Sequence, residues 1–202
     1  MKPEEHILFL INAVSQPSRI QSGRIRQIIS LNQYAEPMSF ILHEGIAALY
    51  RGRDNMLLSN IKAPLVFGLN LLSSTNSDIY IQARGGIRYE LLKRTDFADA
   101  IRTENLWESL ANIYMFNAQK FLELNFTISG VPTYEQVCNS LIALMNENDE
   151  LRLTTNACDY IQEKTLLSRS GIMKMLSDLK QGGHIDVQRG VLIAINKLPE
   201  KY

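Results

Sequence analysis

The 202-residue sequence contains few of the residues that build disulfides, metal sites and catalytic centres. Its two cysteines, Cys138 and Cys158, do not form a Cys-x-x-Cys pair, and both fall in segments that we predict to be helical. We interpret them as small buried apolar side chains and expect neither a disulfide nor a metal site, while a redox role stays open. The three histidines, His6, His43 and His184, are scattered without the spacing of metal ligands.

The sequence also lacks the short motifs through which enzymes hold phosphate groups or activate a nucleophile. It contains no GxGxxG or GxxxxGK[ST] loop and no Gly-x-Ser-x-Gly turn. His43 and Glu44 are adjacent, but neighbouring residues of a strand point to opposite faces and do not form a catalytic pair. We therefore expect no catalytic residues, no cofactor and no enzymatic activity.

Long hydrophobic runs are absent as well. No stretch approaches the ~20 apolar residues that cross a membrane. The first six residues lack the basic segment, apolar run and small-residue cleavage site of a secretory signal. We expect a cytoplasmic protein that does not bind membranes. Its length fits one or two domains, and its 46% hydrophobic and 21% charged residues are typical of a globular protein.

The chain also has no net charge, because 21 basic residues balance 21 acidic ones. This balance does not favour nucleic-acid binding by the chain as a whole. Between Lys164 and Arg189, however, five basic residues stand against two acidic ones. The positive charge is therefore local, and one copy of the segment should bind DNA weakly without a partner subunit.

This basic segment contains an amphipathic helix with a clear start and end. Ser168 is a good N-cap, and Gly182 and Gly183 favour helix termination. Apolar residues recur at three- and four-residue spacing at Ile172, Met175, Leu176 and Leu179. The opposite face carries side chains that can donate to phosphate oxygens or base edges: Arg169, Ser170, Lys174 and Ser177.

A short hairpin is predicted directly after the helix. Ile185 and Val187 alternate with polar residues, Arg189 and Gly190 offer a turn, and residues 192–195 form a returning strand. A helix followed by a hairpin is the arrangement of the recognition helix and wing of a winged helix-turn-helix. We therefore predict contacts with double-stranded DNA from Ser168, Arg169, Ser170, Lys174, Gln188 and Arg189.

The first half of the chain is dominated by β signals. An amphipathic helix is expected over residues 4–14. Strands are expected at residues 24–31, 40–45, 46–50, 56–61, 65–68, 79–83 and 87–91, with hairpin turns at residues 51–55 and 84–86. Many short strands with glycine-marked turns favour a small sandwich or barrel.

Two helices are predicted next. Thr95 is expected to cap a short helix over residues 96–101, and a longer helix should run from residue 103 to about residue 124. The long helix carries two adjacent stripes, one of Leu106, Leu110, Ile113, Asn117, Lys120 and Leu124, the other of Trp107, Ala111, Tyr114, Ala118 and Phe121. One stripe can pack on the β domain and the other on a parallel partner helix, where Asn117 would favour a dimer in one register. The alternative is that both stripes pack within one chain.

The remaining elements are expected to complete a second domain. Residues 125–132 form a hinge, and Thr133 caps a helix that contains Met145. A strand follows at residues 151–153, Thr154 or Thr155 caps a helix over residues 156–162, and residues 163–167 form the turn into the basic helix.

At Ser168, Arg169, Ile172 and Lys174 the sequence resembles the Crp/Fnr superfamily of bacterial transcription regulators. In that family a Ser-Arg pair opens the recognition helix, a β-branched residue follows three positions after the arginine, and a basic residue follows two later. Residues 67–72 and 79–83 extend the resemblance into the β block. It implies an α+β fold with three parts: a β-roll of the double-stranded β-helix type at residues 1–102, a dimerisation helix and hinge at 103–130, and a winged helix-turn-helix at 131–202. The turn at 163–167 is longer than the family's, which leaves the angle between its two helices open.

The resemblance also implies partners. They are a second copy of the chain, held through Leu106, Leu110, Ile113, Asn117 and Leu124; an inverted repeat in DNA, bound through residues 168–181; and RNA polymerase. The family's cyclic-nucleotide site is not expected in this chain. Leu69 and Asn70 replace the glutamate that holds the ribose of a cyclic nucleotide, and residues 75–78 contain no basic residue to pair with its phosphate. The cysteines of the family's iron-sulfur members are missing before Cys138. In its lack of ligand motifs and its short Leu-rich wing region, the chain resembles an enterobacterial branch of regulators linked to oxidative-stress resistance. The alternative from another class is a signalling adaptor that binds a protein through its roll and binds no DNA.

Overall fold

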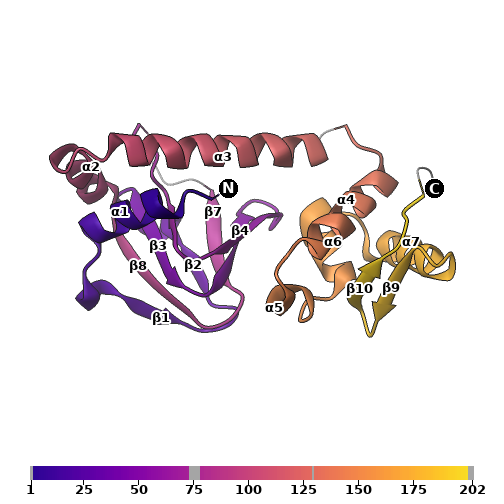
Figure 1. The fold of residues 1–202 in the computed structure, drawn as a ribbon. Coiled ribbons are helices and arrows are strands. Elements are labelled where there is room, and N and C mark those ends of the chain that lie inside the picture. Colours follow the sequence, from indigo (N-terminus) through magenta and orange to yellow (C-terminus); the bar gives the residue numbers. More distant parts are fainter. Residues whose placement is uncertain (1, 73–77, 129, 200–202) are drawn as a thin grey trace. The chain divides into compact units, whose positions relative to one another are not determined.

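A computed structural model describes residues 2–72, 78–128 and 130–199, and the side chains of residues 124–128 are outside the description. The chain divides into two compact units, residues 1–122 and 123–202, which we call the N-terminal and C-terminal units. Figure 1 shows the sheets of the first unit and the helices and hairpin of the second. The predicted α+β class is confirmed: a roll of antiparallel sheets, a long helix and a C-terminal winged helix-turn-helix.

The N-terminal unit is built on two four-stranded antiparallel sheets. One has the order β1-β8-β3-β6 and the other β2-β7-β4-β5. The strands are β1 (Gln21–Gly23), β2 (Ile28–Ser30), β3 (Met38–Glu44), β4 (Ile46–Arg51), β5 (Leu57–Lys62), β6 (Leu65–Phe67), β7 (Ile79–Ala83) and β8 (Ile87–Lys93). Phe40 and Leu42 of one sheet share a buried cluster with Ala47 and Ile81 of the other. Alternate residues of each strand therefore fill the space between the sheets.

Two predictions about these strands are wrong. A single strand was expected over residues 24–31, but a turn in which Arg26 has a φ of 64° separates β1 from β2, and the two strands lie in different sheets. The hairpin expected around residues 84–86 does not form, because β7 pairs with β4 whereas β8 pairs with β3. The turn at residues 51–55 does join a hairpin, in which Ile46 lies opposite Lys62. Local alternation predicts a strand without choosing its partner.

The outer face of the first sheet is covered by helices. They are α1 (Glu4–Val14), α2 (Arg94–Thr103) and the beginning of α3 (Trp107–Ile128), and the short 3-10 turns η1 (Pro17–Arg19) and η2 (Leu31–Gln33) lie in the connections. Leu10, Phe97 and Ile101 pack with Ile41 and Leu92 of the sheet. The expected cap at Thr95 is wrong, since α2 starts at Arg94 after Lys93 and has no side-chain cap.

A buried carboxylate ties the N-terminal segment to the same sheet. Glu90 of β8 is fully buried and accepts hydrogen bonds from Ser15 Oγ at 2.7 Å and from Arg19 Nε at 2.6 Å. Burial opposes ionisation, but the hydrogen bonds from Ser15 and Arg19 outweigh it and hold the pKa of Glu90 below its ordinary value. His43 Nε2 lies 3.4 Å from the same carboxylate.

The long helix α3 differs from its prediction at both ends. It starts at Trp107, after a turn in which Asn105 has a φ of 52°, and it continues through residues 125–128, where a hinge was expected. Its first stripe packs inside the subunit, because Leu110 and Ile113 are buried in the cluster of α1 and α2 with Leu106 beside them. Leu110 and Ile113 are therefore buried within the N-terminal unit and Leu106 is partly buried, whereas the contact between subunits predicted for this stripe stays a prediction. The side chain of Leu124 lies outside the described residues.

The second stripe of α3 is exposed. Trp107 is 47% exposed and Phe121 63% exposed, and Ala111, Tyr114 and Ala118 between them are exposed as well. No helix in the described part of the chain is both long and apolar enough to cross a bilayer.

The C-terminal unit has four helices and a hairpin among its described residues. They are α4 (Thr133–Met145), α5 (Asp149–Arg152), α6 (Ala157–Thr165), α7 (Arg169–Gln181), β9 (Ile185–Gln188) and β10 (Val191–Ile195). Their buried apolar side chains include Leu141, Leu144, Tyr160, Ile161, Ile172, Leu176 and Leu192. These side chains supply the apolar surface that holds the small unit together.

Three local predictions in this unit are wrong. Residues 151–153 are not a strand, because Asn148 caps the helix α5 by accepting a hydrogen bond from Leu151 N at 2.9 Å. Asn156, rather than Thr154 or Thr155, caps α6, and both threonine hydroxyls donate to the carbonyl of Leu151 instead. Finally, α4 follows Pro132 without a side-chain cap, so Thr133 is its first residue. In α5 and α6 an asparagine takes the capping position.

Candidate DNA-binding interface

The turn between α6 and α7 sets the geometry of the helix pair. Because α6 extends to Thr165 and α7 begins at Arg169, only three residues separate the helices, fewer than predicted. Leu166 has a φ of 59° and its N–H donates to the carbonyl of Gln162. This left-handed residue closes α6 where glycine is more common. The short turn matches the three- to four-residue turn of a helix-turn-helix.

The recognition helix α7 has one buried and one exposed face, as its sequence predicts. Ser168 caps it, with its Oγ accepting a hydrogen bond from Gly171 N at 3.3 Å. Ile172, Leu176 and Leu179 are buried. The opposite face is exposed and carries Arg169, Ser170, Met173, Lys174 and Ser177. Burial of the apolar face therefore leaves this row of side chains accessible.

Met173 was missed in the sequence because methionine is commonly a core residue. It is 51% exposed and lies in the middle of the polar row. Its position between Ser170 and Ser177 was the available signal, since it falls outside the spacing of the buried stripe. An exposed apolar side chain in such a row can contact the methyl group of thymine.

Arg169 is held by a neighbour that sequence reasoning did not single out. Its Nη1 makes an ion pair and hydrogen bond with Oδ1 of Asp159 on α6, and the two side chains are 57% and 53% exposed. The hydrogen bond with Asp159 raises the pKa of Arg169 above its ordinary value. No signal at ten-residue separation could have indicated this pair.

The wing is attached to both helices. In the β9–β10 turn Arg189 and Gly190 both have positive φ, 50° and 85°, as a two-residue hairpin turn requires. The N–H of Ala157 donates to the carbonyl of Gly190 at 2.8 Å, and Lys180 Nζ donates to the carbonyl of Val187 at 2.8 Å. These contacts fix the wing against the start of α6 and the end of α7.

The predicted DNA-contacting residues lie on two elements. The helix α7 and its N-cap carry Ser168, Arg169, Ser170 and Lys174. The end of the wing carries Gln188 and Arg189, which are exposed. The Oγ of Ser168 already accepts the capping hydrogen bond from Gly171 N, and Gln188 Nε2 donates to Asp186 Oδ2 at 3.0 Å.

Three other ionisable groups of this unit have pKa values that are shifted by burial. Lys164 packs over the ring of Tyr160, 5.0 Å from its centroid, and burial lowers its pKa. Cys138 and Cys158 are buried, as predicted, and burial raises the pKa of both thiols.

The interior of the roll is filled by side chains. Phe40 and Tyr89 stack with ring centroids 5.7 Å apart, surrounded by Leu42, Ile81 and Ile87. Leu69 and Asn70 are the residues that the sequence resemblance placed where nucleotide-binding members carry glutamate. Leu69 is buried, and Asn70 Oδ1 accepts a hydrogen bond from Leu72 N at 3.2 Å. In the segment 75–78, which lacks a basic residue, residues 75–77 lie outside the described residues. Asp78 Oδ2 accepts a hydrogen bond from Arg53 N at 3.0 Å.

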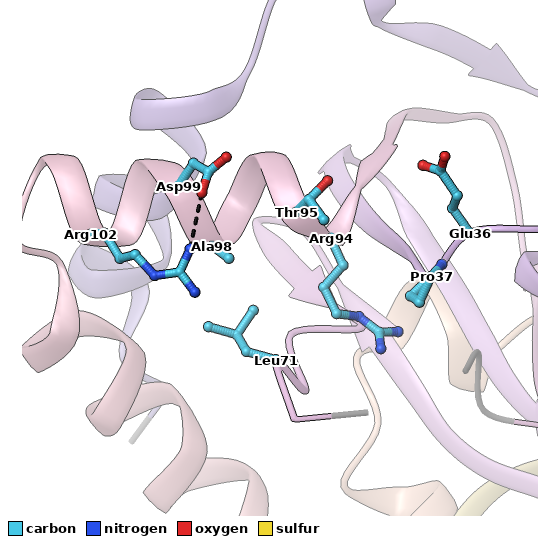
Figure 2. Close-up of a pocket in the computed structure, with 8 residues that line it drawn as sticks. All are labelled: Glu36, Pro37, Leu71, Arg94, Thr95, Ala98, Asp99 and Arg102. Atoms are coloured by element: carbon cyan, nitrogen blue, oxygen red, sulfur yellow. Dashed lines mark hydrogen bonds and ion pairs between the residues drawn. The ribbon is translucent and has the colours of Figure 1, made fainter. Parts of the chain in front are cut away.

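Figure 2 shows a pocket beside α2, on the outside of the roll, lined by Glu36, Pro37, Leu71, Arg94, Thr95, Ala98, Asp99 and Arg102. Arg94 is buried and donates from Nε to the carbonyl of Gly68 at 2.8 Å and from Nη1 to that of Asn70 at 3.2 Å. Arg102 pairs with Asp99 at 3.0 Å. Arg94 therefore positions the segment after β6, and both guanidinium groups at the pocket are engaged with the protein.

Comparisons with known proteins agree with this architecture. Residues 133–200 match the protein-family model for winged helix-turn-helix DNA binding. Over 187 residues the chain is 28% identical to the Escherichia coli protein named inhibitor of hydrogen peroxide resistance, a match that covers 92% of this chain and 89% of that protein.

Solved structures share the whole fold at low sequence identity. The c-di-GMP-responsive global regulator CLP of Xanthomonas campestris superposes with a TM-score of 0.76 at 11% identity, covering 96% of this chain and 100% of that one. A Eubacterium rectale protein assigned to the Crp/Fnr family of transcriptional regulators gives a TM-score of 0.65 at 13% identity, covering 93% of this chain and 90% of that one. The chain therefore has the fold of a Crp/Fnr-family regulator, with a domain that matches winged helix-turn-helix DNA-binding domains, and it is a distant homologue of the Escherichia coli inhibitor of hydrogen peroxide resistance.

Proposed function

We propose that the chain is a dimeric transcription regulator that binds an inverted repeat in double-stranded DNA and is not controlled by cyclic nucleotides. In this proposal residues 1–102 form the roll, residues 103–130 join two subunits, and residues 131–202 bind DNA. The observation that carries it is the exposed row on α7, which holds Arg169, Ser170 and Lys174 beside a wing that ends in Arg189. A helix in the major groove and a basic wing at the phosphates is how such domains dock.

The dimer interface in this proposal uses the exposed stripe of α3. Trp107, Ala111, Tyr114, Ala118 and Phe121 step by four and three residues, which is the a/d spacing of a parallel coiled coil. Asn117 is exposed next to this stripe and flanks the apolar seam, outside its a and d positions. Two subunits related by a two-fold axis would present their α7 helices to half-sites about one helical turn apart, ~34 Å.

The absence of cyclic-nucleotide control is supported by the roll. Its interior is occupied by the stacked rings of Phe40 and Tyr89, so a purine would have to displace buried apolar side chains. Neither Leu69 nor Asn70 offers the carboxylate that a ribose needs. A cyclic phosphate without a basic partner would be costly to bury.

The decisive experiment is a gel shift of the full chain with genomic fragments at two salt concentrations. A DNA-binding regulator should lose affinity steeply as salt rises, because each phosphate contact releases counterions. A signalling adaptor, the alternative from another class, would show neither a shift nor a salt slope, and that result would contradict the proposal. Footprinting of a bound fragment then tests the inverted repeat.

The biological role follows from the relative. We propose that the genes controlled by this chain affect resistance to hydrogen peroxide, acting in the cytoplasm with RNA polymerase as the further partner. The chain resembles the Escherichia coli inhibitor of hydrogen peroxide resistance over nearly its whole length. The buried thiols Cys138 and Cys158 have raised pKa values and little thiolate, which disfavours direct oxidation by peroxide. Deleting the gene should raise survival in peroxide, and unchanged survival would remove this part of the proposal.

A further inference from the structure

We infer that Asp159 determines the sequence specificity of this protein by positioning the guanidinium group of Arg169 for guanine. The inference rests on the proposed function, because it assigns a role within DNA recognition by α7. Asp159 is the third residue of α6 and Arg169 the first residue of α7, so their ion pair joins the two helices of the helix-turn-helix.

Both partners stand on rigid backbone. The side-chain amide oxygen of Asn156, Oδ1, accepts hydrogen bonds from the backbone N–H groups of Cys158 at 2.9 Å and Asp159 at 3.3 Å. These two bonds fix the first turn of α6. Arg169 follows the three-residue turn directly and is preceded by the N-cap Ser168. The contact between Asp159 and Arg169 therefore leaves the guanidinium little freedom, although both side chains are about half exposed.

The geometry leaves the guanidinium able to bind a base. An arginine has five N–H donors in a planar fork, and the contact with Asp159 uses only Nη1. Nε and Nη2 form another edge of the same plane, with two parallel donors for O6 and N7 of guanine. A long side chain that is already oriented loses less conformational entropy on binding than a free one.

The charge of Asp159 works against DNA in general. A carboxylate close to the phosphate backbone is repelled, and it also offsets the positive charge of Arg169 on any sequence. The cost is recovered only where Arg169 finds guanine. Asp159 should therefore lower the affinity for non-specific DNA and raise the affinity for the preferred site, so that the ratio of the two increases.

The test is selection of binding sites by the full-length chain and by Asp159→Asn, Arg169→Ala and the double variant. Glu150→Gln is the matched control, because it removes one acidic charge from the first turn of another helix in the same unit. Asp159→Asn should weaken the guanine preference at the position where Arg169→Ala abolishes it, with the specific-to-non-specific ratio falling about two- to fivefold per half-site, the range expected for an exposed ion pair. In the Arg169→Ala background the same change should have no further effect on the ratio, because the positioned group is gone.

Each other outcome is equally clear. If Asp159→Asn matches Glu150→Gln and leaves the sequence preference unchanged, the ion pair is an incidental surface contact and the inference is wrong. If preference is lost at a different position from Arg169→Ala, Asp159 contacts a base itself, as a carboxylate can at cytosine N4, and the inference is also wrong. If the unaltered chain binds no DNA, the proposed function fails instead. A thermal melt of each variant separates these results from misfolding.

Discussion

A glutamate placed in either of the two stripes of α3 should have a different effect on the protein. Ala118→Glu places a carboxylate on the exposed stripe, and in a two-fold dimer the same charge appears on both helices at the contact. Two like charges a few ångströms apart repel by about 1 kcal/mol in water and by about 4 kcal/mol at an effective dielectric constant of 20. Together with the lost apolar contact, this should shift the dimer to monomers by one or more orders of magnitude.

The matched variant is Leu110→Glu, eight residues earlier on the same helix. Leu110 is 7% exposed in the cluster with Phe97 and Ile101. Its replacement removes about 1.5–3 kcal/mol of apolar burial and adds the cost of an unpaired buried charge, so a loss of ~5 kcal/mol is expected. That is comparable with the whole stability of many domains. Ala118→Glu, on an exposed position, should change the stability of the monomer by no more than about 0.5 kcal/mol.

Sedimentation equilibrium and urea unfolding measure the two effects separately. The expected result is a folded monomer for Ala118→Glu and an unstable protein for Leu110→Glu. An Ala118→Glu protein that sediments as a dimer at the concentration where the unaltered chain does would place the subunit contact elsewhere. A stable, folded Leu110→Glu protein would refute the packing of the first stripe on the roll.

Four further predictions concern DNA contacts, ligand response and pH. Arg169→Ala should cost ~1–3 kcal/mol per half-site and relax the preference at one position, whereas Lys174→Ala and Arg189→Ala should weaken all sequences alike and lower the salt slope by about one phosphate each. Met173→Ala should weaken binding only at sites with a thymine under that side chain, and replacing that thymine with deoxyuridine should abolish the difference between the two proteins. Cyclic AMP should leave the melting temperature unchanged, although a true ligand at 100 times its Kd would add ~2.7 kcal/mol. The pKa of Glu90 is lower in the folded chain than in the unfolded one, so the ionised carboxylate stabilises the fold at pH values above the unfolded pKa. This contribution is lost as the pH falls through the folded pKa, and Glu90→Gln should remove this part of the acid sensitivity.

Each of these four predictions has a result that would contradict it. An unchanged sequence preference with uniformly weaker binding would make Arg169 a phosphate contact. A loss at deoxyuridine sites that is the same with and without Met173 would show that another group contacts the methyl. A rise in melting temperature with increasing cyclic AMP would contradict the filled roll, and parallel pH profiles of Glu90→Gln and the unaltered chain would contradict the role of that carboxylate.

The elements that could be predicted from the sequence are those whose signals are local. Ser168, the spacing of Ile172, Leu176 and Leu179, and the left-handed Gly183 define α7 within one stretch of chain, and they were predicted with the correct exposed face. The wing was predicted for the same reason, since its two-residue turn and alternating strands are close in sequence. Caps and periodicity act over a few residues, so a sequence states them directly.

Which surfaces pack against one another depends on contacts between distant parts of the chain and could not be predicted from local patterns. Strands β7 and β8 alternate alike whether they pair with each other or with strands of two different sheets, and that choice depends on partners tens of residues away. The two stripes of α3 have similar apolar character, and the surface offered by α1, α2 and the first sheet selects Leu110 and Ile113 for burial. Likewise, Asp159 reaches Arg169 because Leu166 adopts a left-handed conformation and shortens the turn between their helices. In each case the deciding contact joins residues that no local pattern relates.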